Sequence, residues 1–176
     1  MKQLVVISAV GTDRPGVVHG ISQSILECGG NIVESRMSVL GSEFAMLMLV
    51  SGTWHTIVKL ESDLPKLGED GGLFVNVRRT KDRPARDNLL PYAIDVVCLD
   101  QPGIVANLAR FFASRDIEIA ELITHSYSAA HTGAPMFSVQ MSVNIPSTLH
   151  ISALREEFMD FCDQYNLDAI LEPVKA

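Results

Sequence analysis

A four-residue motif occurs twice in this 176-residue chain, as Asp-Arg-Pro-Gly at 13–16 and as Asp-Gln-Pro-Gly at 100–103. Each motif follows an apolar run rich in β-branched residues and precedes apolar residues at helical spacing. The surrounding residues repeat at the same spacing, as in the pairs Ile7 and Ile94, Val10 and Val97, Val18 and Val105, Ile32 and Ile119, and Glu34 and Glu121. Such regular self-similarity indicates that one structural unit is present twice.

Each copy spans about 80 residues, near the lower end of the size range of domains. The segment between the copies is charged, poor in apolar residues and interrupted by Pro84, which is typical of a linker. We therefore expect a first domain at 1–80, a linker at 81–90 and a second domain at 91–176. Units this small bury a little over ~60% of the surface of the unfolded chain, so each is expected to pack against the other or against a second chain.

The periodicity of apolar residues predicts the same element order in both copies, which is strand, helix, strand, strand, helix, strand. Gly29 and Gly30 are expected to end the first helix, Thr53 to cap the second, and Gly68 with Gly71 and Gly72 to break it before the last strand. Strands are predicted in the first copy at 4–10, 31–40, 44–50 and 73–77, and in the second copy at 92–99, 117–127, 136–143 and 167–171. This order predicts an α+β chain with two ferredoxin-like βαββαβ domains in tandem, each with both helices on one face of its sheet.

The strand at 44–50 is apolar on both faces, with Phe44, Met46 and Met48 on one and Leu47 and Leu49 on the other. A sheet with helices on one side only would leave the second face in water. We therefore predict that another copy of the chain or a partner covers it, most simply in a homodimer.

Charge argues against direct contact with nucleic acid, because the chain has 14 basic and 21 acidic residues and a net charge of −7. Arg78 and Arg79, with the basic residues of the expected linker, form a local basic cluster that is interpreted as a solvated linker, since no aromatic residues are interleaved with it.

The apolar stretch at 4–10 is too short for a signal peptide and no run approaches the roughly 20 apolar residues of a membrane span. These features predict a cytoplasmic protein without membrane contact. Three cysteines without CxxC spacing are expected to be buried, reduced thiols, at Cys28, Cys98 and Cys162.

The turn at 13–16 has a chemistry that suits a small zwitterion. Pro15 sets φ near the start of a helix, and Gly16 removes the Cβ that would keep a ligand from the first free amides. Those amides attract a carboxylate, while Asp13 accepts an ammonium group. The alternative is that Asp13 and Asp100 only cap helices and that Pro-Gly only forms the turn.

Neither a catalytic constellation nor a metal site is expected. No nucleophile elbow or phosphate loop occurs. His125 and His131 lack a third ligand at metal spacing, and His19 is interpreted as a surface or interface residue. The sequence thus predicts a protein that is not an enzyme and has no cofactor.

The element order, the Asp-Arg-Pro-Gly-Val-Val run after the first strand and the Gly-Gly-Asn-Ile run that opens the second resemble an ACT domain, the amino-acid-sensing module. Two such domains fill nearly the whole chain, and this arrangement most resembles the glycine cleavage system transcriptional repressor family. The resemblance implies a regulator that responds to a small amino acid, glycine first, and acts by binding a DNA-binding transcription factor. It implies a ligand where the turn of one unit meets the second strand of its neighbour, at Asp13, Arg14, Pro15, Gly16, Val17, Val18 and Asn31.

The second copy keeps the turn at Asp100, Pro102, Gly103 and Ile104, which are its candidate ligand residues. It departs from the first copy with Gln101 in place of Arg14 and Glu118 in place of Asn31. An acid at 118 repels a ligand carboxylate, so this second site is a weaker candidate. ACT pairs also precede the catalytic part of formyltetrahydrofolate deformylases. The alternative function is therefore a regulatory subunit or remnant of an enzyme of amino-acid or one-carbon metabolism.

Overall fold

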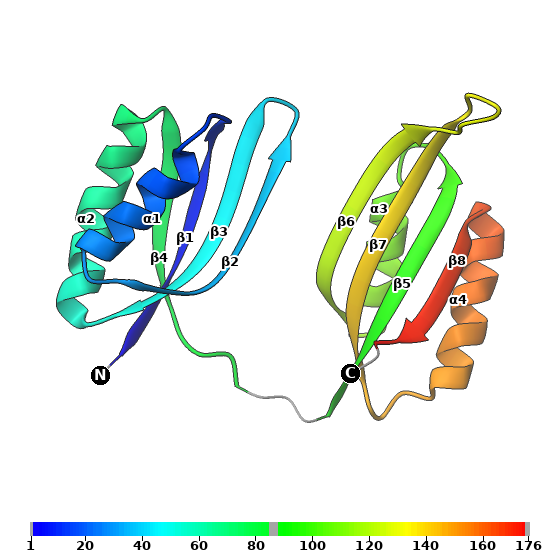
Figure 1. Ribbon diagram of the computed structural model, residues 1–176. Coiled ribbons are helices and arrows are strands. Elements are labelled where there is room, and N and C mark those ends of the chain that lie inside the picture. The colour runs from blue at the N-terminus through cyan, green and yellow to red at the C-terminus, as the bar shows by residue number, and fades with distance from the viewer. Residues whose placement is uncertain (1, 85–87, 175–176) are drawn as a thin grey trace. The chain divides into compact units, whose positions relative to one another are not determined.

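The computed structural model describes residues 2–84 and 88–174 (Figure 1). The chain divides into two compact units, at 1–84 and 85–176. Each unit has its own sheet, its own pair of helices and its own core. The last two residues of the expected linker at 81–90 belong instead to a strand, because β5 (Leu89–Leu99) begins at Leu89.

The predicted βαββαβ order is confirmed in both units. The first unit contains β1 (Gln3–Thr12), α1 (Val17–Glu27), β2 (Asn31–Leu40), β3 (Glu43–Gly52), α2 (Trp54–Asp70) and β4 (Leu73–Thr80). The second contains β5, α3 (Ile104–Ala113), β6 (Glu118–Ser128), β7 (Pro135–Pro146), α4 (Ile151–Tyr165) and β8 (Asp168–Pro173). The sheets have the orders β2-β3-β1-β4 and β6-β7-β5-β8, all antiparallel, and in each unit both helices cover one face (Figure 1).

Alternating residues of the central strands build each core. In the first unit, Val5, Ile7 and Ala9 of β1 are fully buried, and they pack with Met48 and Val50 of β3 under the helices. The second core contains more aromatic residues, since the rings of Phe111, Phe112 and Phe158 are mutual neighbours and those of Phe161 and Tyr165 extend the cluster. The helical face of the second unit is therefore filled by rings where the first has aliphatic and small residues.

The second helix of the first unit corrects one prediction. Thr53 caps α2 as expected, with its Oγ1 accepting from the backbone N–H of Thr56 at 3.3 Å. Gly68, however, does not break the helix, which continues to Asp70. A Cβ at Gly68 would lie 2.5 Å from Cγ2 of Val75, so the glycine lets α2 pack closely on β4. The chain turns at Gly71 and Gly72, as expected, the latter with φ +69°.

The sheet face that points away from the helices differs between the two units. In the first unit this outer face exposes Val10 by 44%, Leu47 by 54% and Phe74 by 76%, as expected for a strand that is apolar on both faces. On β7 of the second unit the corresponding positions carry Ser138, Gln140 and other polar residues. β7 is thus more polar on this face than β3, although the outer face of the second unit also exposes Leu99, Ile123 and Ile170 on its other strands.

Two further expectations concern thiols and membrane spans. Cys98 and Cys162 are free and buried, whereas Cys28 is only half-buried because it lies at the end of α1. Among the described helices, none is both long and apolar enough to span a bilayer.

Candidate functional site

The repeated motif forms the turn between the first strand and the first helix of each unit. Gly16 and Gly103 are the N-cap residues of α1 and α3, with φ +91° and +93°. Glycine adopts this left-handed conformation without steric cost. No described side chain caps either helix, so the alternative in which Asp13 and Asp100 are helix caps is wrong. The amides of the first helical turn therefore have no side-chain partner in the described part of the chain.

The two motif aspartates have different surroundings. The backbone N–H of Asp13 donates to Ser42 O at 3.0 Å, and that of Asp100 donates to Pro135 O at 2.9 Å, which ties each turn to the neighbouring hairpin. The carboxylate of Asp100 accepts a hydrogen bond from Oγ of Ser126 at 2.7 Å. The exposed carboxylate of Asp13 has no such partner among the described residues.

The second motif residue connects the turn to the end of the second helix. Nη2 of Arg14 donates to the carbonyl oxygen of Gly71 at 2.6 Å, and Nε2 of Gln101 donates to that of Tyr165 at 3.3 Å. A side chain at Gly71 would put its Cβ 3.2 Å from the guanidinium, so the glycine leaves room for Arg14. A cation at this place also complements the negative end of the helix dipole of α2.

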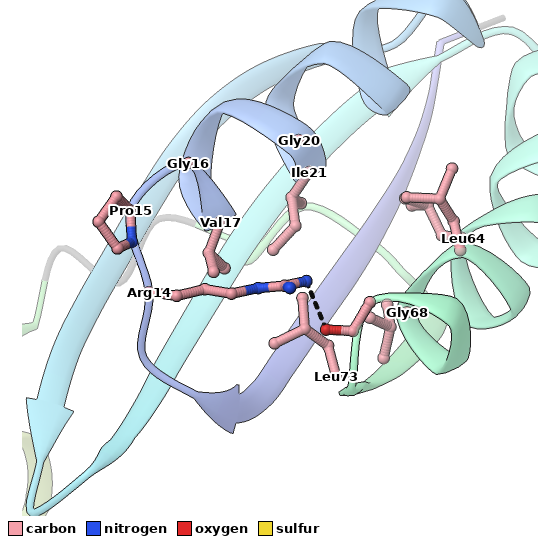
Figure 2. A pocket seen from close by; sticks show the side chains of 12 residues that line it. Arg14, Pro15, Gly16, Val17, Gly20, Ile21, Leu64, Gly68 and Leu73 are labelled. Atoms are coloured by element: carbon pink, nitrogen blue, oxygen red, sulfur yellow. Dashed lines mark hydrogen bonds between the residues drawn. The ribbon is translucent and has the colours of Figure 1, made fainter.

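A cavity of about 220 Å³ lies beside this contact, between α1, α2 and β4 (Figure 2). Arg14 extends from the turn toward the end of α2, with Val17 and Ile21 of α1 on one side and Leu73 on the other (Figure 2). A second cavity of about 220 Å³ occupies the corresponding place in the second unit, next to Gln101.

The structure brings together part of the predicted site. Arg14, Pro15, Gly16 and Val17 line the first cavity, whereas Asp13, Val18 and Asn31 do not. Asn31 pairs with Ser51 near the end of β3, while Thr12, just before the turn, pairs with Glu43 at its beginning. Within one unit, Asn31 thus lies at the opposite end of the sheet from the turn. In the second unit Pro102 and Ile104 line the cavity, and Asp100 and Gly103 do not.

Sequence reasoning missed the residues that α2 and β4 contribute. The cavity lining also includes Gly20, Ile21, Leu64, Leu67, Gly68, Gly71, Leu73 and Val75. Gly68 was the available signal, since a glycine inside an apolar helical pattern often marks close packing. The expectation of a helix break at Gly68 overlooks this signal, because α2 continues to Asp70.

Other polar groups show no second site of the expected kinds. In the described part of the chain, no three His, Cys, Asp or Glu side chains are grouped to hold a metal ion. The guanidinium of Arg79 forms two hydrogen bonds with the carboxylate of Glu61, at 2.7 and 2.8 Å, and this pairing lowers the pKa of Glu61. Part of the basic cluster before the linker is thus neutralised within the first unit.

The repeated fold and the glycine-containing turn define a tandem ACT-domain protein, and the ACT domain model matches residues 3–78. Over 169 residues the chain is 31% identical to the glycine cleavage system transcriptional repressor of Escherichia coli strain K12. This alignment covers 96% of this chain and 89% of the relative. The chain therefore belongs to the glycine cleavage system transcriptional repressor family, a family of regulatory proteins.

Two solved structures match the chain over nearly its full length. A crystal structure of a protein assigned as a glycine cleavage system transcriptional repressor is 30% identical, with a TM-score of 0.76 over 100% of this chain and 99% of the other. A protein of unknown function from Galdieria sulphuraria is 28% identical, with a TM-score of 0.83 over 99% and 100%. The tandem of two ACT units is thus shared by both.

Proposed function

We propose that this protein is a non-enzymatic regulator that links the level of a small amino acid, glycine first, to transcription of the glycine cleavage genes. The observation that carries the proposal is the 31% identity to a repressor of that system over 96% of the chain, which includes both ACT units. A regulator of this kind works in the cytoplasm and requires no cofactor besides its effector.

The proposed route to DNA is indirect. The chain carries a net charge of −7, and proteins that bind the phosphate backbone directly present a basic surface. In the described part of the chain, Arg79 of the basic cluster is paired with Glu61. These charges support regulation through a DNA-binding transcription factor that the protein contacts.

The proposed effector site is the turn at 13–16 together with the second strand of a neighbouring unit. The amides at the start of α1, which no described side chain caps, suit a carboxylate, and the Asp13 carboxylate, which has no partner among the described residues, suits an ammonium group. Because Asn31 lies at the far end of its own sheet, its proposed contribution comes from an adjacent unit. In the second unit, Asp100 is already bonded to Ser126, which supports a weaker site there.

A reporter experiment tests this function. Deletion of the gene should change expression from the glycine cleavage promoter and remove its response to added glycine. The purified protein alone should leave a promoter fragment unshifted in a gel, and it should associate with a DNA-binding protein bound to that fragment. An unchanged promoter response in the deletion strain would contradict the proposal.

A further inference from the structure

The cavity of the first unit is lined by one cationic side chain and by several apolar side chains. Arg14 supplies the cation, and Ile21, Leu64, Leu73 and Val75 are among the apolar residues that line the cavity. Of the described residues, no acidic side chain lines this cavity. A ligand held there therefore finds a partner for a carboxylate and for an aliphatic chain, but no carboxylate to receive an ammonium group.

The guanidinium of Arg14 has spare hydrogen-bonding capacity. An arginine carries five N–H donors. Within the described residues Arg14 makes one hydrogen bond, to the carbonyl oxygen of Gly71, and pairs with no carboxylate. Its remaining donors match the fork geometry of a carboxylate.

The second unit provides an internal comparison. Its equivalent cavity has the same volume of about 220 Å³, but Gln101 replaces the cation and Asn107 and Tyr165 make the lining more polar. Asn107 occupies the place of Gly20 in the repeat. Two cavities of equal size thus differ in charge, and only the one in the first unit suits an anion.

We propose that the cavity between α1, α2 and β4 of the first unit binds a short aliphatic carboxylate that lacks an α-ammonium group. The volume of about 220 Å³ lies below the ~300–1,000 Å³ of drug-sized sites, so the ligand is a small metabolite. Short-chain fatty acids and branched 2-oxo acids share this chemistry. The cavity shares Arg14, Pro15, Gly16 and Val17 with the proposed glycine site but not Asp13 or Asn31, so the inference differs from the glycine response in the ligand class it predicts, a carboxylate without an ammonium group.

Calorimetry on the full chain tests the proposal with four probes, which are 4-methylpentanoate, 4-methyl-2-oxopentanoate, leucine and glycine. Leucine has the carbon skeleton of the first probe with an added ammonium group, so this pair isolates the cost of burying an unpaired cation. We expect at least one of the two carboxylates to bind at least about 10-fold more tightly than leucine does. The tighter of the two identifies the source as a fatty acid or a 2-oxo acid.

Two variants and one control locate the site. Arg14→Gln removes the charge, and Gln101 shows that a glutamine can keep the contact with the end of the second helix. This variant should weaken carboxylate binding at least about 10-fold. Gly20→Leu should abolish binding by filling the cavity, and it should fold because a Cβ at Gly20 meets nothing within 4 Å. The control Gln101→Ala should bind as the wild type does.

Absence of carboxylate binding to the wild type, tighter binding of leucine, or unchanged binding in Arg14→Gln or Gly20→Leu would each overturn the proposal. The glycine titration distinguishes failure of the carboxylate proposal from failure of the proposed glycine response. A glycine signal that survives Gly20→Leu belongs to a different site. Carboxylate binding without any glycine signal would contradict the glycine effector and leave this inference standing.

Discussion

At the scale of single residues, the motif glycine has a conformational role and the motif aspartate a chemical one. Gly16 and Gly103 both have a φ near +90° at the start of a helix. Asp13 and Asp100 do not cap these helices, and only Asp100 has a described side-chain partner, Ser126. The two residues of one turn are therefore open to separate mutational tests.

Gly16→Ala should destabilise the protein by about 1–2 kcal/mol, because alanine in the left-handed region brings its Cβ close to the following carbonyl oxygen. Gly20→Ala is the matched control. It lies inside α1 with open space around a Cβ, and should stabilise by roughly 0.5–1 kcal/mol. Urea unfolding followed by circular dichroism measures both changes. Equal effects of the two substitutions would contradict the conformational role of Gly16.

Asp13→Ala should weaken amino-acid binding by about 10- to 150-fold, which corresponds to the loss of one charge-assisted hydrogen bond of ~1.5–3 kcal/mol. The fold should be unaffected, since this carboxylate is exposed and makes no bond within the described chain. Asp100→Ala should cost less affinity, because Asp100 is bonded to Ser126 and Glu118 replaces Asn31 in the second unit. Calorimetry with glycine compares the three proteins. Unchanged affinity in Asp13→Ala would remove this residue from the site.

At the scale of elements, the two units carry the same helices with different packing. On α4, Phe158, Phe161 and Tyr165 contact residues of α3. The positions that repeat them in the first unit are Leu64 and Leu67 of α2 and Gly71, its C-cap residue. Cys162 of α4 occupies the place of Gly68 in this comparison and is buried in the core of the second unit. Burial raises the pKa of the Cys162 thiol to about 12.

The raised pKa of Cys162 predicts a loss of stability in alkaline solution. Well below the ordinary thiol pKa of about 8.5, the thiol is protonated in both the folded and the unfolded chain. Between about pH 9 and 12 only the unfolded chain releases this proton, so the free energy of unfolding falls as pH rises. From pH 9 to 10 the wild type should lose roughly 1 kcal/mol more than Cys162→Ala. Urea titrations at the two pH values measure this difference, and parallel losses would contradict it.

At the scale of the whole molecule, the outer sheet faces distinguish the two units. Leu47 on β3 is exposed and apolar, and its counterpart in the repeat is the exposed Gln140 on β7. An apolar patch of this kind marks an interaction surface. The expected homodimer remains a prediction, and the central strand of this face, which carries Leu47 in the first unit and Gln140 in the second, favours the first unit as its interface.

Leu47→Lys and Phe74→Asp should each weaken the homodimer by roughly 10- to 150-fold, since burial of such a side chain stabilises an interface by about 1.5–3 kcal/mol. Gln140→Lys on the second unit is the matched control and should leave association unchanged. Light scattering coupled to size exclusion gives the mass of each variant. A wild type that is monomeric at all concentrations would contradict the dimer.

By itself, the sequence determined the element order, the duplication, the cap at Thr53 and the glycine turns, because alternation, helical spacing and glycine dihedral preference are local properties of the chain. Only the tertiary structure decided that Gly68 lies inside a helix, because contact with Val75 on another element outweighs the low helix propensity of glycine. The same is true of the partner of Arg14, which lies 57 residues further along the chain. The cavity, too, depends on how α1, α2 and β4 meet, and such distances between elements leave no local pattern in the sequence.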